Sequence, residues 1–392
     1  MSTILMEENE EPASPTARMM QVPGFDICIY AIMGYVTLID LDLFKSDLGQ
    51  TLVKHPRFSS LLVAKDKKGG KYSWKQTIVD IEKHVFAPDL DPNMESPDKF
   101  VENFISRLSR EKLDPTKPVW EMHVLNVKPS YANSTVIFKI DHSIGDGVSL
   151  ISFILACAKK TSNPESEPAM PSKKPKIKID RDKINNNIGL LMTMKKLFSS
   201  VWIIFLVFYY TLIDLVVFLA TILFFKDTKT PIKGAKEVEN SPKRFVHRIV
   251  DLDDVKLVKN AMNADPLDHI GRSKATMDRK KLSLQPNCVF MILKLIIKLF
   301  GTKVAAKITS RIFYSTTVAV SNVMGPQKDI VLYGHPLSYI APTVSGFPQL
   351  CQKANYYEEL VPNPHQLCDE LQNSLLNLKE TVKKKGLSIK PL

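Results

Sequence analysis

The sequence lacks the cysteine patterns that would indicate a disulfide framework or a metal site. No Cys-x-x-Cys pair occurs, and no histidine stands at zinc-finger spacing from a cysteine. Scattered cysteines in odd number are typical of reduced thiols in a cytosolic compartment, so we expect neither disulfides nor a bound metal. The five cysteines are Cys28, Cys157, Cys288, Cys351 and Cys368.

The chain also lacks a secretory signal and a nucleic-acid-binding signature. Residues 1–11 are acidic and contain no basic stretch followed by an apolar one, so we expect no export. An excess of 53 Lys plus Arg over 41 Asp plus Glu gives a net charge of +12. Without an RNP-like motif or a zinc finger, this charge does not predict a nucleic-acid partner. Seven lysines stand in residues 173–178 and 383–385, where we expect a solvated linker and tail.

One long hydrophobic run is present, at residues 197–225. About 20 apolar residues suffice to cross a bilayer, but Asp214 in the middle of the run would cost roughly 2.5–3.5 kcal/mol there. Three placements compete: a single span, a helical hairpin or surface-lying anchor, and a buried helix of a soluble core. The length and the Trp and Tyr content favour membrane attachment. If the halves of the chain before and after the run form one site, a single span is excluded.

The rest of the 392-residue chain, of which 44% is hydrophobic, alternates strand-like and helix-like segments around a polar linker. The pattern predicts a mixed α/β protein in four parts. We expect a first structured part at residues 1–160, a disordered linker at 161–196, the hydrophobic segment at 197–225 and a second structured part at 226–392. Strands are predicted at 118–125, 134–140, 316–321 and 330–332, and helices at 148–160, 287–300, 302–312 and 364–379.

A short polar segment after the predicted strand 134–140 carries the chemistry. His142 would stand at the strand end, ahead of a turn in which Asp146 and Gly147 open the following helix. An imidazole held in this way can accept a proton near neutral pH and return it. The alternative is structural: Asp146 caps the helix, a contribution of about 1 kcal/mol, Gly147 relaxes the turn, and His142 is incidental.

The segment His142-Ser-Ile-Gly-Asp146-Gly147 resembles the His-x-x-x-Asp-Gly motif of CoA-dependent acyltransferases with the chloramphenicol-acetyltransferase-like fold. Further segments resemble the plant branch of the bifunctional wax ester synthase/diacylglycerol acyltransferases. The resemblance extends from near residue 12 to near residue 380. The segments that carry it are residues 12–18, 118–121, 226–231, 321–326, 333–336 and 362–368.

This resemblance implies a two-lobed fold, with an N-terminal lobe at residues 1–160 and a reduced C-terminal lobe at 226–392. It also implies direct transfer of a long-chain acyl group from acyl-CoA to a fatty alcohol or to diacylglycerol. His142 would be the general base, while Asp146, Gly147 and Asp141 would support the motif. No metal or redox cofactor is implied. Because the acceptors partition into lipid, the hydrophobic segment would keep the site at a membrane. We expect the endoplasmic reticulum membrane with the site facing the cytosol, and the plasma membrane as the second possibility.

The sequence departs from the family pattern in three places. Asp141 replaces the first of two adjacent histidines, and an acid beside His142 would favour the protonated imidazole, which is not a base. Segments of sheet or helix are missing after Ala264 and between Gln349 and Tyr356, so we expect an incomplete second lobe. The alternative function is therefore a catalytically impaired, membrane-attached pseudoenzyme or shortened splice form that binds lipid or a full-length relative; an imperfect gene model is a further explanation of the gaps.

Overall fold

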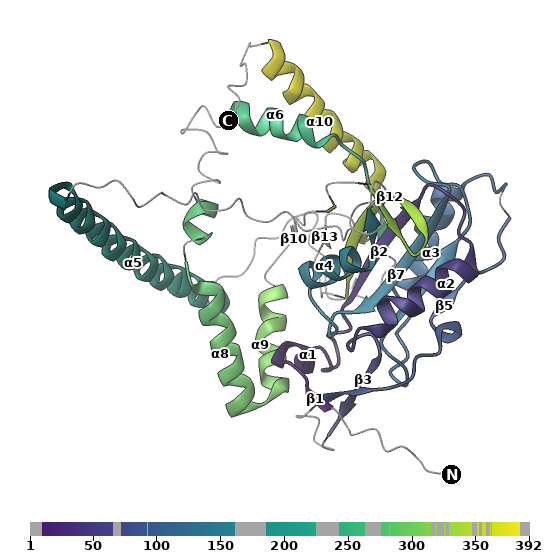
Figure 1. Ribbon diagram of the computed structural model, residues 1–392, viewed down its shortest axis with the longest axis horizontal. Helices are drawn as coiled ribbons and strands as arrows, with labels where there is room; N and C mark the ends of the chain where they lie inside the picture. Colours follow the sequence, from purple (N-terminus) through teal and green to yellow (C-terminus); the bar gives the residue numbers. More distant parts are fainter. Residues whose placement is uncertain are drawn as a thin grey trace. The chain divides into compact units, whose positions relative to one another are not determined.

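The computed structural model divides into two compact units (Figure 1). The core unit comprises Met1–Pro171, Thr228–His247 and Ile296–Pro364, and the helical unit comprises Ser172–Asp227, Arg248–Leu295 and His365–Leu392. Within these bounds the structure describes residues 10–65, 72–91, 93–160, 186–224, 243–262, 276–281, 283–314, 318–319, 325–326, 329–346, 351–352, 355–357, 361 and 363–384.

A seven-stranded sheet forms the centre of the core unit, in the order β5-β6-β7-β2-β12-β11-β8. All neighbours are antiparallel except β5 and β6, which are parallel. Predicted strands 118–125, 134–140 and 330–332 are confirmed as β6, β7 and β11. The strands are β2 (Cys28–Tyr35), β5 (Val85–Phe86), β6 (Trp120–Leu125), β7 (Ser134–Asp141), β8 (Lys159–Lys160), β11 (Ile330–Leu332) and β12 (His335–Ser345).

Helices cover both faces of this sheet (Figure 1). Its central strand β2 is buried along its whole length. Because side chains alternate along a strand, Ile29, Ala31 and Met33 enter one hydrophobic cluster while Tyr30 and Ile32 enter the other. The first cluster contains buried residues of α2 (Leu41–Gln50) and α4 (Gly147–Cys157), and the second contains those of α3 (Pro97–Leu108). This double burial explains why β2 reads as an uninterrupted apolar run.

Strand β12 comes from the chain after the hydrophobic run, yet it pairs with β2 from Ser345↔Cys28 to Leu337↔Tyr35. At one end of β12, Gly346 has a φ of +93°, and a Cβ there would clash with the backbone oxygen of Asp26. At the other end, the buried His335 lies 3.1 Å from Thr37 Oγ1, and its Nε2 accepts a hydrogen bond from the Asp40 amide at 3.2 Å. Parts of the expected C-terminal lobe thus share a sheet and a compact unit with the N-terminal lobe. The four-part division itself stays a prediction.

Two smaller sheets and several short elements complete the core unit. One sheet has the order β1-β4-β3 and the other the order β10-β13-β14-β9. Of the predicted strand 316–321, only Val318–Ala319 is described. The elements are β1 (Glu10–Pro12), β3 (Ser60–Ala64), β4 (Tyr72–Gln76), β9 (Lys243–Phe245), β10 (Val318–Ala319), β13 (Cys351–Gln352), β14 (Asn355–Tyr357), α1 (Pro15–Met19), α9 (Thr302–Tyr314), and the 3-10 turns Leu52–Lys54 and Ile81–Lys83.

The helical unit contains α5 (Asn186–Leu223), α6 (Leu252–Met262), the start of α8 (Gln285–Phe300) and α10 (Pro364–Lys384). The Lys379–Asp254 ion pair at 2.6 Å ties α10 to α6. The helices predicted at 287–300, 302–312 and 364–379 are confirmed by α8, α9 and α10.

Two expected segments differ from the structure. The helix predicted at 148–160 ends at Cys157, because Lys159 and Lys160 pair with β11 instead. Within the expected linker, residues 161–185 lie outside the described residues, and α5 already begins at Asn186.

Candidate active site

The motif occupies the connection between β7 and α4 in the core unit. His142 directly follows the last residue of β7, and its backbone amide donates a hydrogen bond to the carbonyl oxygen of Ile27 at 2.9 Å. This bond fixes the histidine backbone to the entry of β2, while the side chain is half-buried. The predicted placement of His142 at a strand end is confirmed. That its imidazole is held rigidly within reach of a ligand stays a prediction.

Asp141 closes the turn that begins at His142. Its carboxylate accepts a hydrogen bond from the Ser143 amide at 2.8 Å, and its carbonyl oxygen accepts one from the Ile144 amide at 3.1 Å. Burial raises the pKa of Asp141 above its usual value, because desolvation penalises the charged carboxylate. The acid that replaces the first histidine is therefore part of the backbone architecture of the turn.

Asp146 caps the N-terminus of α4. Its carboxylate accepts a hydrogen bond from the Ser149 amide at 2.8 Å. Hydrogen bonding to Ser149, first through its side chain and then through this amide, lowers the pKa of Asp146, and the charge of His142 contributes less. Gly147 opens the helix, but its φ is not positive and a Cβ there would meet nothing within 4 Å. Neither crowding nor a left-handed backbone requires glycine at this position, so the turn-relaxing role expected of Gly147 has no support in the structure.

A cavity of about 650 Å³, which we call the motif cavity, adjoins the motif on the Asp141 side. This volume is within the range of ligand-binding cavities, roughly 300–1,000 Å³. Its wall is built from Cys28 and Tyr30 of β2, from Ser345 and Gly346 at the end of β12, and from the loop 109–115. His142 is not among the described residues that line it. Of the motif residues 141–147, Asp141 is the one that lines this cavity.

The polar groups around the motif cavity carry charges of both signs. Lys112 pairs with Asp26 at 2.7 Å, and Arg110 and Lys243 also line the cavity. Cys28 offers no nucleophile, because burial raises the pKa of its thiol to about 12. The cavity can thus receive a polar or phosphate-bearing group at its basic side chains, but its walls supply no thiolate for covalent chemistry.

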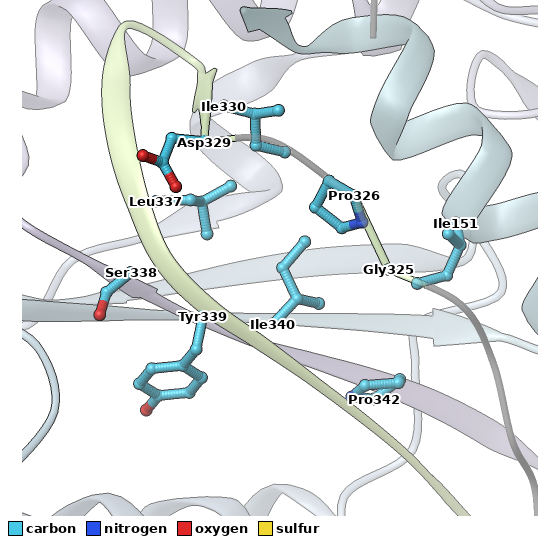
Figure 2. Close-up of a pocket in the computed structure, with 10 residues that line it drawn as sticks. All are labelled: Ile151, Gly325, Pro326, Asp329, Ile330, Leu337, Ser338, Tyr339, Ile340 and Pro342. Carbon is cyan, nitrogen blue, oxygen red and sulfur yellow. The ribbon is translucent and has the colours of Figure 1, made fainter. Parts of the chain in front are cut away.

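A smaller hollow of about 260 Å³ lies between α4 and β12 (Figure 2). Gly325 and Pro326, which belong to the segment 321–326 that resembles the family, form one wall beside Ile151 of α4. Figure 2 shows the Ile340 side chain directed toward Pro326, whereas the Tyr339 side chain points away from the opposite face of the strand. The structure thereby brings this segment against the helix that starts in the motif. Residues 226–231 and 321–324 lie outside the described residues.

Sequence reasoning missed a buried charged group beside the motif strand. Lys139 is fully buried on β7, where its ammonium donates to the Glu111 carbonyl oxygen at 2.9 Å and lies 3.2 Å from Glu121 Oε1. His123 Nε2 lies 3.3 Å from the same carboxylate oxygen. A lysine at an inward position of an otherwise apolar strand was the available signal. Among the described residues, no three His, Cys, Asp or Glu side chains gather as a metal site would require; the lack of a cofactor stays a prediction.

Comparison with known proteins decides the family. Residues 13–268 match the wax ester synthase/diacylglycerol acyltransferase catalytic domain, and residues 255–379 match the C-terminal domain of the same family. The chain belongs to the wax ester synthase/diacylglycerol acyltransferase family. This confirms the resemblance found in the sequence and, at the level of the family, the acyltransferase class.

Two relatives from Arabidopsis thaliana show how the chain compares with other members of the family. Wax ester synthase/diacylglycerol acyltransferase 11 is 34% identical, with 96% of each chain covered, and number 7 is 33% identical, with 96% of this chain and 99% of the relative covered. The first alignment spans 475 positions whereas this chain has 392 residues, so at least 83 positions are occupied only in the relative. The chain therefore lacks internal segments that this relative has.

The fold agrees with a solved structure of the family. The wax ester synthase/diacylglycerol acyltransferase from Marinobacter aquaeolei VT8 superimposes with a TM-score of 0.54 at 14% identity, covering 95% of this chain and all of that one. The predicted α/β acyltransferase fold is confirmed. The exact gaps expected after Ala264 and between Gln349 and Tyr356 fall mainly on residues outside those that the structure describes.

Proposed function

We propose that this protein transfers a long-chain acyl group from acyl-CoA to a fatty alcohol or to diacylglycerol, with His142 as the general base. The observation that carries the proposal is the fixed backbone of His142 between the β7 end and the capped start of α4, in a chain that belongs to this family. The products are a wax ester or a triacylglycerol, and free CoA.

The reaction needs one proton acceptor and no covalent enzyme intermediate. His142 takes the proton of the acceptor hydroxyl as its oxygen attacks the thioester carbonyl. When the tetrahedral intermediate collapses, the carbon–sulfur bond breaks and the CoA thiolate takes up the proton that the imidazole holds. General base catalysis of this kind contributes about 10²–10⁴ in rate.

Asp141 and Asp146 position this histidine without taking part in the proton transfer. Each carboxylate holds a backbone amide on the C-terminal side of His142, at Ser143 and at Ser149 respectively. The two bonds fix the chain from the strand end to the first turn of α4. The motif cavity is the compartment that we propose for one of the two substrates, because basic side chains such as Arg110 and Lys112 in its lining attract a phosphate-bearing group such as CoA.

We further propose that the protein is attached to the endoplasmic reticulum membrane with its site facing the cytosol; the plasma membrane is the second location. The support is the apolar part of α5, Phe198–Leu223, which is long and apolar enough to cross a membrane and of which only 11% of the most apolar window is buried. Both acceptor classes are lipid-soluble, so attachment would bring the site to its substrate.

Microsomes that express the protein, supplied with labelled palmitoyl-CoA and either a fatty alcohol or diacylglycerol, test the activity. We expect labelled ester above the level of microsomes without the protein, and a return to that level in His142→Ala expressed in equal amount. No ester from well-expressed wild type would overturn the proposal.

That negative result would favour the alternative of a membrane-attached pseudoenzyme. The alternative is supported by the alignment with wax ester synthase/diacylglycerol acyltransferase 11, in which at least 83 positions are occupied only in that relative. A binding measurement then separates the two: retention of a lipid or of a full-length relative without turnover supports the pseudoenzyme.

A further inference from the structure

We infer that α5 lies along the membrane surface, with its exposed apolar face in the lipid, and does not cross the bilayer. The inference rests on the membrane attachment proposed above and adds its geometry. The partner is a lipid surface that carries anionic headgroups. Two independent observations carry it, one from the strand order of the core unit and one from the contacts of α5 within the helical unit.

The strand order places both flanks of α5 on the same side of any membrane. β2 and β7 precede α5 in the chain and β12 follows it, yet β2 pairs along its length with both. A sheet with this order cannot be divided by a bilayer. The chain must therefore cross an even number of times or not at all, which excludes a single span.

A hairpin of two spans is the remaining way to cross, and the described residues offer one helix that is long and apolar enough, Phe198–Leu223. The next apolar helix, α8, has 16 residues, or about 24 Å, against a hydrocarbon core of about 30 Å. It also carries Lys294 and Lys298. α8 is too short and too charged to return the chain through a bilayer.

The second observation is a polar bracket at the midpoint of the apolar segment. The buried Asp214 pairs with Arg279 at 3.2 Å, and Thr211 Oγ1 accepts a hydrogen bond from the Leu284 amide at 2.9 Å. Residues 279–284 are thus fixed beside the middle of α5. In a crossing orientation these contacts would lie at the centre of the bilayer.

Charged side chains accompany this bracket. Asp278 and Lys281 form an exposed ion pair at 3.1 Å on either side of Arg279, and Lys280 is also exposed. Charges are strongly disfavoured at the bilayer centre unless they face a protein interior or water. Along a membrane surface the same residues remain in water, on the side of α5 away from the lipid.

The surface of α5 away from the bracket is suited to lipid. Its large apolar side chains are exposed, among them Phe205, Phe208, Leu212 and Val216, each more than half accessible. Apolar surface of this extent is rare on a soluble monomer and marks an interaction site. In the sequence, Lys195 and Lys196 precede the apolar segment and Lys226 and Lys229 follow it, which complements anionic headgroups.

Depth-dependent fluorescence quenching tests the orientation. The full-length protein is bound to phosphatidylcholine vesicles with a minority of phosphatidylserine, with bromine on the lipid either near the headgroup or near the chain end. The probe is a tryptophan at the midpoint, Leu212→Trp in a Trp202→Phe background, and the reference is the native Trp202 near one end. Trp74 and Trp120 give a constant background because both are buried in the core unit.

We expect the headgroup-proximal bromines to quench the probes at 212 and at 202 to a similar extent. Stronger quenching at 212 by the chain-end bromines would place the midpoint at the bilayer centre and overturn the inference. In microsomes, glycosylation acceptors introduced just before and just after α5 are both expected to stay unmodified; modification of either would also overturn it.

A sedimentation measurement separates failure of the orientation from failure of the attachment. Phe208→Ser with Leu212→Ser should weaken vesicle binding about tenfold or more, whereas Ile78→Ser, at an exposed apolar residue of the core unit, should not. Wild type that does not sediment with vesicles overturns the attachment and the inference together. Stable dimers that shield this face without bromine quenching would assign it to a second copy and overturn the inference.

Discussion

Two stretches of this chain, β2 and the apolar part of α5, are both rich in apolar residues, but β2 is buried and the α5 segment is largely exposed. Every residue of β2 is buried, because helices cover both faces of its sheet. Most of Phe198–Leu223 is exposed, and its two buried residues, Thr211 and Asp214, are polar. In β2 the protein itself supplies the apolar surroundings. In α5 most of the apolar side chains stay exposed, so they can contact lipid.

The largest expected difference in stability between the two stretches is found by replacing one apolar residue in each of them. Ile32→Ala in β2 should lower the free energy of unfolding by about 2–5 kcal/mol, because the side chain is fully buried. Leu212→Ala on α5, where the leucine is 63% exposed, should change it by less than about 0.5 kcal/mol in lipid-free buffer. Chemical denaturation of the full chain measures both. Equal losses would show that α5 has a protein partner on that face.

A substitution at Gly346 tests how closely the end of β12 approaches the chain before β2, and a substitution at Gly147 is its control. Gly346→Ala should cost about 1–3 kcal/mol, because its φ is positive and its Cβ would clash with Asp26. The matched control is Gly147→Ala, in which the added Cβ has no atom within 4 Å. This variant should have an unchanged or slightly higher melting temperature. A loss of acyl transfer in the stable Gly147→Ala protein would indicate that a substrate approaches this backbone. Unchanged stability in Gly346→Ala would contradict the described sheet.

The cap of α4 should have a smaller and pH-dependent effect. Asp146→Ala is expected to lower stability by about 1 kcal/mol at pH 7, while Asp146→Asn, which also caps a helix, should be nearly neutral. Because the folded pKa of Asp146 is lowered, the stability from its charge is present above its unfolded pKa and is lost as the pH falls through the folded pKa. Thermal melts of the three proteins between neutral and acid pH measure this. Equal acid sensitivity in Asp146→Asn would assign the effect to other groups.

Asp141 should show the opposite pH dependence. Burial raises its folded pKa, so its charged form is less favourable in the folded protein, and protonation as the pH falls through that value relieves the cost. Asp141→Asn removes the ionisation while keeping an acceptor for the Ser143 amide. We expect its stability at pH 7 to equal or slightly exceed that of wild type, with the pH dependence from this group gone. A clear loss at pH 7 would show that the charged carboxylate is needed.

Local features of the site were predictable from the sequence, whereas its walls were not. The strand end at His142 and the cap at Asp146 follow from a β-branched run and a helix-opening Asp-Gly pair, both of which are local. The motif cavity joins Cys28, loop 109–115 and Ser345, and only the strand order brings such distant positions together. The pairing of β2 with β12 could not be predicted either, because the sequence of one strand does not show which distant strand pairs with it. The sequence placed Asp214 inside the apolar run but could not show that Arg279 pairs with it.

The most direct test of the central claim is the initial rate of acyl transfer by the full-length protein in membranes, with wild type and His142→Ala compared at equal amounts of folded protein. We predict a fall of about 10²–10⁴-fold in the variant, because a positioned general base contributes that much. Asp146→Asn serves as the control for the motif and should retain most of the rate. Equal rates for wild type and His142→Ala would contradict the account.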